Sequence, residues 1–184
     1  MAPRKHTRAE VVDRVALVFR DHGYEGATLS RISEATDLGR ASLYHHFPGG
    51  KEDMGRAVLE RVAVQLAEPF DALSGDGTPE ERLAGFLRGV DAFYEKGKRN
   101  CLLGAMVLSG GHPRFAEELS ARFKEWVDGL AAVSRASGHE GREARRRAED
   151  AVARIQGGLV VARGLGKGSI FKRTLAELPE YLLA

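Results

Sequence analysis

The stretch "TLSRISEATDLGRASLYHHFPGGKEDM", from Thr28 to Met54, contains two short helix patterns separated by a turn. Thr28 is a residue type favoured at the N-cap of a helix, and the Asp-Leu-Gly sequence at 37–39 has the composition of a tight turn. A second short helix is expected over residues 40–46, because the Pro-Gly-Gly sequence at 48–50 ends it. The pattern predicts a helix-turn-helix, in which two helices are joined by a short turn.

A further helix is expected before this pair. Apolar residues recur at i, i+3, i+4 and i+7 from Val12 to Phe19, which is the spacing of one helix face. Thr7 and Glu10 form a capping box at its start, and Gly23 is expected to end it. The first 50 residues therefore predict a small domain of three short helices.

The rest of the chain shows the same helical periodicity, and strand signals are nearly absent from the sequence. We expect an all-α fold of about nine helices, with a helix-turn-helix domain over residues 1–50 and a second helical domain over residues 51–184. The helices expected in the second domain span residues 51–73, 78–96, 101–109, 113–137, 142–166 and 169–183.

The composition is that of a folded protein, with 43% hydrophobic and 29% charged residues among 184. The net charge of +2 permits a nucleic-acid partner without requiring one. A single cysteine, Cys101, excludes an internal disulfide and favours the cytoplasm. No stretch approaches the roughly 18 apolar residues of a membrane span. The N-terminus lacks the apolar segment of a signal peptide.

The outward side of the helix over residues 40–46 has the side chains that read DNA. In a helix-turn-helix the second helix enters the major groove. Arginine pairs with guanine, serine reads either base edge, and alanine contacts the thymine methyl group. The residues expected to face outward are Arg40, Ala41, Ser42, Tyr44 and His45.

Cations beside this helix suit phosphate oxygens. Lys51 lies at the start of the next helix, where the helix dipole also favours an anion. Arg4, Lys5 and Arg8 could add a basic arm. Spacing alone leaves two interpretations open, because an exposed polar cluster is also what an ordinary solvated helix face presents.

The sequence contains none of the common enzyme or metal signatures. His45 and His46 are adjacent, so they point about 100° apart on a helix and are poorly placed to share a metal. The "GLGKGS" sequence at 164–169 does not fit a phosphate-binding loop. We expect no enzyme activity, no metal and no cofactor.

The stretch from Thr28 to Met54 resembles the DNA-binding domain of the TetR/AcrR family of transcriptional regulators. The resemblance covers about the first 55 residues, including the "LYHHF" sequence followed by "KE". The matching residues are Phe19, Gly23, Tyr24, Thr28, Ile32, Ala35, Leu38, Leu43, Tyr44, Phe47 and Lys51.

The resemblance implies a ligand-responsive regulator, most simply a repressor. It would bind a palindromic double-stranded DNA operator as a homodimer and be released by a small effector. Thr28 would contact a phosphate, and Tyr44 and Lys51 would clamp phosphates. Arg40, Ser42 and His45 would face the groove.

Two positions depart from the family pattern. Asp37 stands where the family usually has glycine in the turn, and Asp tolerates a left-handed backbone better than most residues. Gly39 stands where the family usually has a Ser or Thr cap; glycine is an acceptable cap but has no side chain to offer a phosphate.

The resemblance also implies an effector pocket in the second domain. Its candidate wall is apolar, which favours an apolar effector, although the same residues would equally form plain core. Cys101 has the corresponding alternatives of a redox sensor and a small buried residue. The candidate pocket residues are Leu66, Phe70, Phe86, Phe93, Leu102, Met106, Phe123 and Trp126.

The resemblance further implies that the last two helices form a four-helix bundle with a second subunit. Two glycines in mid-helix each cost roughly 1 kcal/mol against alanine, which indicates a close helix approach. Burial within one subunit is the alternative explanation. The candidate interface residues are Gly157, Gly158, Val161, Leu165, Leu175, Leu178 and Leu182.

A second class of function stays open on the sequence. An all-α small-molecule-binding or scaffold protein without DNA binding would have the same second domain. The basic and polar cluster between Arg40 and Lys51 favours the regulator, and a gel shift with DNA distinguishes the two.

Overall fold

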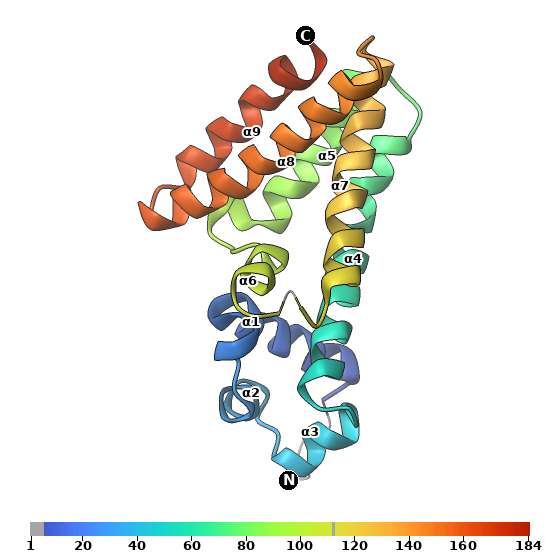
Figure 1. Ribbon diagram of the computed structural model, residues 1–184. Coiled ribbons are helices and arrows are strands. Elements are labelled where there is room, and N and C mark those ends of the chain that lie inside the picture. Colours follow the sequence, from blue (N-terminus) through green and yellow to red (C-terminus); the bar gives the residue numbers. More distant parts are fainter. Residues whose placement is uncertain (1–5, 112) are drawn as a thin grey trace. The chain divides into compact units, whose positions relative to one another are not determined.

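The computed structural model describes residues 6–111 and 113–184. Over these residues the chain forms nine α-helices, one 3-10 helix and no strand (Figure 1), which confirms the all-α prediction. Arg4 and Lys5, the outer part of the expected basic arm, lie outside the described residues. The elements are α1 (Arg8–Gly26), α2 (Leu29–Thr36), α3 (Arg40–His46), α4 (Lys51–Ser74), α5 (Pro79–Phe93), η1 (Glu95–Gly97), α6 (Leu102–Leu108), α7 (Ala116–Ala136), α8 (Gly141–Gly164) and α9 (Gly168–Leu183).

Local capping signals place the helix starts correctly. Thr7 caps α1 through a reciprocal capping box with Glu10, and Thr78 caps α5 with Glu81 in the same way. These pairs satisfy backbone N–H groups that have no partner within the helix.

Two predicted helix ends were wrong. Gly23 takes φ 65° and ψ −178° and kinks α1, but the helix continues to Gly26. The helix expected to reach residue 96 ends at Phe93, because Glu95 and Lys96 both have a positive φ, of 50° and 58°.

The chain forms two compact units. The first contains Met1–Val64 and Leu102–Leu119, and the second contains Gln65–Cys101 and Ser120–Ala184. The division lies inside α4, which starts at Lys51 and is continuous through residues 64 and 65. The boundary that the sequence predicts at residue 50 divides the chain by function and not by packing, and it stays a prediction.

The core of the first unit is formed by apolar faces of α1 to α4 and of α6. Arg61 on α4 also forms a bidentate ion pair with Asp13 on α1, with N–O distances of 2.7 and 2.9 Å. Residues without any exposed surface in this core include Val11, Val15, Phe19, Ile32, Leu43, Phe47, Met54 and Val58.

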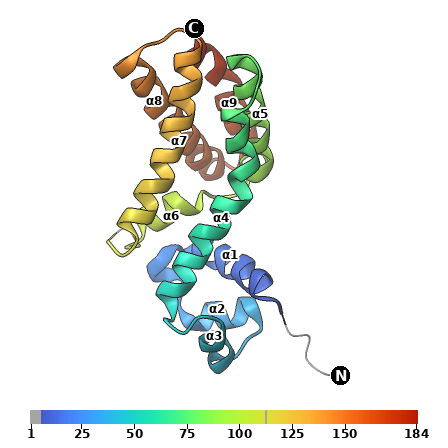
Figure 2. The same ribbon diagram turned by 90° about the vertical axis from the view of Figure 1, so that its right-hand side faces the viewer.

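In the second unit, α8 and α9 run side by side, and α5 lies along the second half of α4 (Figures 1 and 2). The α4–α5 packing is close, because a Cβ at Gly89 would lie 2.4 Å from Pro69 Cγ. Ser134 Oγ on α7 donates a hydrogen bond to the Leu182 carbonyl of α9 at 3.0 Å.

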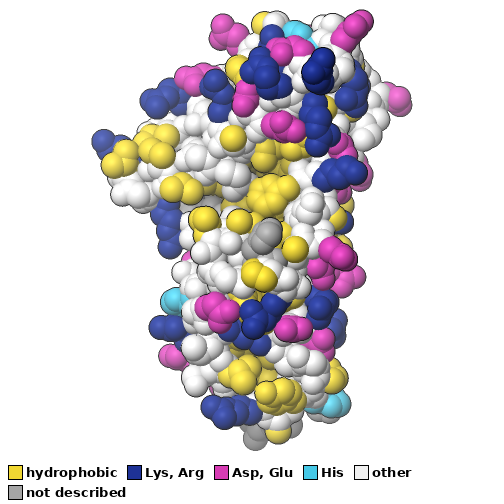
Figure 3. All heavy atoms as spheres, in the orientation of Figure 1, with side chains coloured by type: hydrophobic (Ala, Val, Ile, Leu, Met, Phe, Trp, Pro, Cys, Tyr) yellow, Lys and Arg dark blue, Asp and Glu magenta, His cyan; other side chains and the backbone are white. Residues whose placement is uncertain are grey.

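Charges of both signs are interspersed over the visible surface, and hydrophobic side chains gather near the end of α8 (Figure 3). The apolar residues exposed there are Val160, Val161 and Leu165. No helix in the described ranges is long and apolar enough to cross a membrane.

Candidate nucleic-acid interface

The turn between α2 and α3 has a defined backbone geometry. Asp37 closes α2 with φ 57° and ψ 34°, the left-handed conformation that the sequence predicted. Ser33 Oγ donates to the Leu38 carbonyl at 2.6 Å, which holds the chain as it leaves the turn. Gly39 then caps α3 with an extended backbone and no side-chain hydrogen bond. These contacts determine the direction in which α3 starts.

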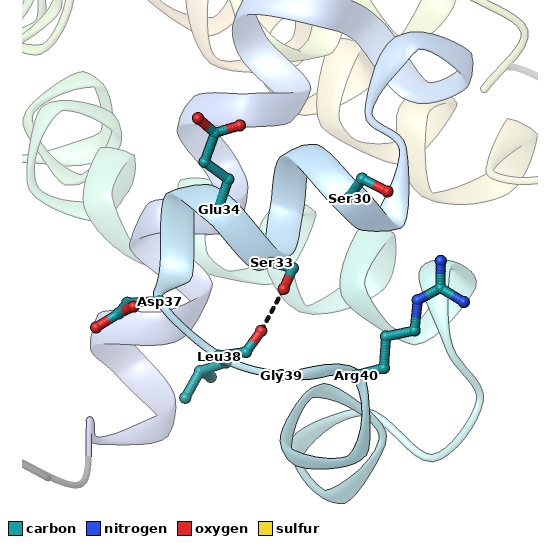
Figure 4. A pocket seen from close by; sticks show the side chains of 7 residues that line it. All are labelled: Ser30, Ser33, Glu34, Asp37, Leu38, Gly39 and Arg40. Carbon is teal, nitrogen blue, oxygen red and sulfur yellow. Dashed lines mark hydrogen bonds between the residues drawn. The ribbon is translucent and has the colours of Figure 1, made fainter.

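A hollow of about 480 Å³ lies against this turn (Figure 4). In the close-up, the Arg40 side chain extends from the start of α3, and Asp37 lies at the opposite end of the turn. The hollow is therefore polar and open beside the side chain that we expect to read bases. It is lined by Ser30, Ser33, Glu34, Asp37, Leu38, Gly39 and Arg40.

Helix α3 is anchored on one side and free on the other. Leu43 and the following Phe47 are fully buried. Tyr44 is 47% exposed in spite of its aromatic ring. The five residues predicted to face outward are all exposed: Arg40, Ala41, Ser42, Tyr44 and His45. Their contact with DNA stays a prediction.

The residues predicted to contact phosphate lie at helix starts. Thr28 is exposed at the N-cap of α2, and its Oγ1 accepts a hydrogen bond from Arg31 N at 3.3 Å. Lys51 Nζ lies 4.5 Å from the centroid of the Tyr24 ring and donates to the Glu25 carbonyl at 3.4 Å. Burial lowers the pKa of Lys51, while the Glu25 charge opposes this shift. Lys51 is therefore oriented by protein groups before any phosphate arrives.

Two other cations lie near these helices. Arg8 lies over the Phe47 ring at 5.3 Å. Arg31, which the sequence analysis missed, is exposed in the first turn of α2 and donates to the Gly26 carbonyl at 2.8 Å. Arg31 lies three residues after the Thr28 cap, and this spacing could have identified it as a neighbour of the predicted phosphate contacts.

The described residues contain no group of three His, Cys, Asp or Glu side chains that could hold a metal. The His45 and His46 rings lie 5.9 Å apart in an edge-to-face arrangement.

The candidate pocket residues are distributed over both compact units. Leu102 and Met106 belong to the first unit, whereas the other six belong to the second. Within the second unit, Phe70, Phe86 and Trp126 form an edge-to-face cluster with centroid distances of 5.3 to 5.6 Å. Leu66, Leu102, Met106, Phe86 and Trp126 are buried, and Phe70, Phe93 and Phe123 are partly exposed.

A groove of about 570 Å³ lies between α4 and α5, two of the helices that contribute to this aromatic cluster. Phe93 is the only candidate pocket residue among those lining it, which are Gln65, Glu68, Pro69, Ala72, Gly85, Arg88, Gly89, Ala92 and Phe93. Cys101 is buried and accepts a hydrogen bond from the Tyr94 hydroxyl at 3.3 Å.

The candidate interface residues divide into two groups. Gly157 and Val161 on α8 are exposed, as is Leu165, the residue that caps the end of this helix. Gly158, Leu175, Leu178 and Leu182 are buried inside the chain, and Gly158 lies against Thr174 of α9.

Residues 15–58 match the family model described as bacterial regulatory proteins, tetR family. The match covers the second part of α1, all of α2 and α3, and the start of α4, which include the elements that form the surface described above. Residues 15–58 therefore form a TetR-family DNA-binding segment. Regulators of this family bind DNA and are not enzymes, in agreement with the sequence prediction.

Two curated TetR-type relatives show where the similarity lies. The chain is 40% identical over 63 residues to the transcriptional repressor AcnR of Corynebacterium glutamicum, covering 34% of this chain and 33% of AcnR. It therefore spans about a third of that relative's length. It is 24% identical over 162 residues to the regulator LmrA of Bacillus subtilis, covering 85% of this chain and 86% of LmrA.

Solved TetR structures share the fold over the full chain. A TetR regulator from Legionella pneumophila superposes with a TM-score of 0.84 at 20% identity, covering 98% of this chain and 99% of that one. A cysteine mutant of the TetR regulator CifR, complexed with 26-base-pair operator DNA, has a TM-score of 0.77 at 27% identity, covering 99% and 98%.

Proposed function

We propose that this chain is a TetR-family, ligand-responsive transcriptional repressor that binds a palindromic operator as a homodimer in the cytoplasm. The observation that carries the proposal is the exposed row of polar and cationic side chains on α3, held over buried Leu43 and Phe47. AcnR is a repressor and the CifR structure contains operator DNA, which supports the same class of function here.

The two kinds of DNA contact have separate roles. Arg40 and Ser42 on α3 would read base edges in the major groove, because their side chains project from the exposed side of that helix. Thr28, Tyr44 and Lys51 would contact phosphates, which set the register of the protein without reading sequence.

Binding-site selection followed by affinity measurements tests this division. DNA retained by the wild-type protein is selected from a random library, and variants are compared on the selected operator and on altered ones. Lys51→Ala should weaken binding to all of them by about tenfold, because a charge-assisted contact is lost. Arg40→Ala should instead change which operator is preferred.

The exposed Lys124 on α7 provides a matched control, since Lys124→Ala removes the same charge from a residue of the second unit, outside the candidate nucleic-acid interface. An equal loss for every operator in Arg40→Ala would exclude base reading by Arg40. If the wild-type protein retains no DNA, the chain is better described as an all-α binding protein without DNA activity.

The effector of this repressor would be a small apolar or aromatic molecule bound at the Phe70–Phe86–Trp126 cluster. These three side chains come from α4, α5 and α7 and carry no charge. A strongly anionic ligand would lose its hydration there without a partner. Because Trp126 is the only tryptophan, an effector should change its fluorescence over the concentration range in which it releases operator DNA. An effector that releases DNA with unchanged fluorescence, and with equal affinity for Trp126→Phe, binds elsewhere.

A further inference from the structure

The end of α6 is hydrogen-bonded to the end of α1. Tyr24 N donates to Ser109 Oγ at 2.7 Å, and Glu25 N donates to the Ser109 carbonyl at 3.2 Å. Ser109 Oγ donates its own proton to the Ala105 carbonyl at 2.5 Å, so its lone pairs are available to Tyr24 N. One serine therefore binds two consecutive backbone N–H groups of α1.

This approach is close enough to require glycine on both sides. Gly23 has φ 65°, and a Cβ there would lie 2.2 Å from both Cβ and Oγ of Ser109. Gly110 has φ 76°, and a Cβ there would lie 2.8 Å from Glu25 Cγ. Because no side chain fits at either position, the two segments lie nearly backbone to backbone.

The two residues that Ser109 binds are the two that hold Lys51. Lys51 Nζ lies 4.5 Å from the Tyr24 ring centroid and donates to the Glu25 carbonyl at 3.4 Å. The Tyr24 ring is itself fixed, since it is 4% exposed and lies 5.2 Å from the Phe115 ring in an edge-to-face contact. The position of the Lys51 ammonium thus depends on contacts made by the segment after α6.

Arg114 connects the same segment to both neighbours of Lys51. Its guanidinium lies 5.5 Å from the Tyr24 ring centroid and 3.5 Å from the Glu25 carboxylate. It also lies 3.5 Å from the carboxylate of Glu52, the residue that follows Lys51 in α4. We call these residues the α6–α7 strap, defined as Ser109, Gly110, Gly111, Arg114 and Phe115.

We propose that the α6–α7 strap positions the Lys51 ammonium for its phosphate contact, with Ser109 and Arg114 as positioning residues. The proposal rests on the proposed function, in which Lys51 binds a DNA phosphate. The strap lies within Leu102–Leu119, a stretch of the first unit whose chain continues into the second unit at both ends. The strap is therefore joined to the second unit by the chain at both ends, and to Lys51 by its non-covalent contacts with Tyr24 and Glu25.

A double-mutant cycle on the selected operator tests the proposal. Ser109→Ala removes the acceptor of Tyr24 N and should lower operator affinity roughly fivefold. In a Lys51→Ala background, Ser109→Ala should change operator affinity by less than about twofold, because both substitutions act on the same contact between Lys51 and a phosphate. Ser120→Ala, at an exposed serine of α7, is the matched control and should bind like wild type.

Arg114→Ala provides a second cycle at a half-exposed position, where loss of the fold is not expected, and should give the same pattern. Equal fold-losses with and without Lys51 would show that the strap acts through general stability, and would overturn the proposal. A Lys51→Ala variant with wild-type affinity would also overturn it, because no contact would remain to be positioned.

A measurement without DNA separates this proposal from the proposed function. The Lys51 side-chain resonances, shifted by the Tyr24 ring, should move towards those of an exposed lysine in Ser109→Ala. The lowered pKa of Lys51 should also rise towards its usual value. If the Lys51 resonances are unchanged in folded Ser109→Ala, the strap does not position Lys51, and the proposal is overturned even if the wild-type protein binds its operator. A protein that binds no DNA, with Lys51 shifted as expected, would instead contradict the proposed function.

Discussion

At the scale of the residue, the turn before α3 depends on one backbone conformation. Asp37 has φ 57° and ψ 34°, and its N–H is directed to the carbonyls of Ser33 and Glu34 at the end of α2. L-residues generally avoid this region because Cβ approaches the following carbonyl, and Asp is among the exceptions. The orientation of α3 therefore relies on a residue that tolerates a left-handed backbone.

The stability of variants at residue 37 should depend on how well the new residue tolerates a left-handed backbone. Asp37→Val should lower the free energy of unfolding by about 1–2 kcal/mol, because a β-branched residue is strained at positive φ. Asp37→Gly should be neutral or stabilising by up to about 1 kcal/mol, because glycine has no Cβ. Urea unfolding measures both, with Asp37→Asn as the conservative control. A valine variant as stable as wild type would contradict the assigned conformation.

At the scale of the element, α8 contains two adjacent glycines with different surroundings. A Cβ at Gly158 would lie 2.8 Å from Thr174 Oγ1 and 3.2 Å from Thr174 Cβ on α9. A Cβ at Gly157 would meet nothing within 4 Å among the residues that the structure describes. The close helix approach expected from the sequence therefore involves only one of the two glycines within the chain.

The two positions provide a matched pair of alanine substitutions. Gly158→Ala should lower the free energy of unfolding by about 1–3 kcal/mol, because Thr174 is stiff at χ1 and its hydroxyl is already bonded to the Ile170 carbonyl. Gly157→Ala should raise it by about 0.5–1 kcal/mol through helix propensity. Denaturant unfolding at one protein concentration compares them, and equal effects of both would contradict the packing described.

The start of α8 is joined to the end of α9 by a charged network. Arg146 and Arg147 each donate to the Glu143 carboxylate at 2.8 Å, and Arg147 also donates to the Tyr181 carbonyl at 2.6 Å. The hydrogen bonds from Arg146 and Arg147 lower the pKa of Glu143 to about 2. Glu143 therefore stays ionised in the folded protein to more acidic pH than in the unfolded chain.

This shift predicts a dependence of stability on pH. Because the folded-state pKa of Glu143 is lowered, its contribution is present above the unfolded value of 4.5 and is lost as the pH falls to about 2. The thermal midpoint of wild type should fall more steeply over this window than that of Glu143→Gln. Glu177→Gln, which removes a carboxylate 3.8 Å from Arg173, serves as the control and should keep the wild-type slope. Parallel curves for Glu143→Gln and wild type would contradict the network.

At the scale of the whole molecule, three apolar side chains near the end of α8 are exposed and could form an interface with another protein chain. Val160, Val161 and Leu165 are 66%, 47% and 62% exposed. Apolar groups gathered in this way on a surface commonly mark an interface. In the proposed dimer they form the contact between subunits, while the buried leucines of α9 stabilise the helix pair that presents them.

A charge in this cluster should separate the subunits. The double variant Val161→Glu, Leu165→Glu should sediment as a monomer at micromolar concentration, whereas wild type should be a dimer. Its affinity for a palindromic operator should fall by roughly 100-fold or more, because the two half-sites are then bound independently. Leu108→Glu, at an apolar residue 85% exposed on α6, is the matched control. A monomeric wild-type protein would exclude this assembly.

The sequence by itself determined the features that depend on neighbours within about four residues. The capping boxes at Thr7 and Thr78, the turn at Asp37 and the outward side of α3 all follow from local hydrogen bonds and helical period. Most of the candidate nucleic-acid interface lies in this category, because its residues lie along α3 and at the starts of α2 and α4.

Only the tertiary structure decided which apolar faces meet. Leu175, Leu178 and Leu182 have the same pattern whether they face α8 or a second subunit, and the fold buries them within the chain. The bond from Tyr24 N to Ser109 Oγ joins residues 85 positions apart. Local propensity does not predict such a contact, because it forms only when α1 and α6 pack together and the N–H groups at the end of α1 find acceptors on Ser109.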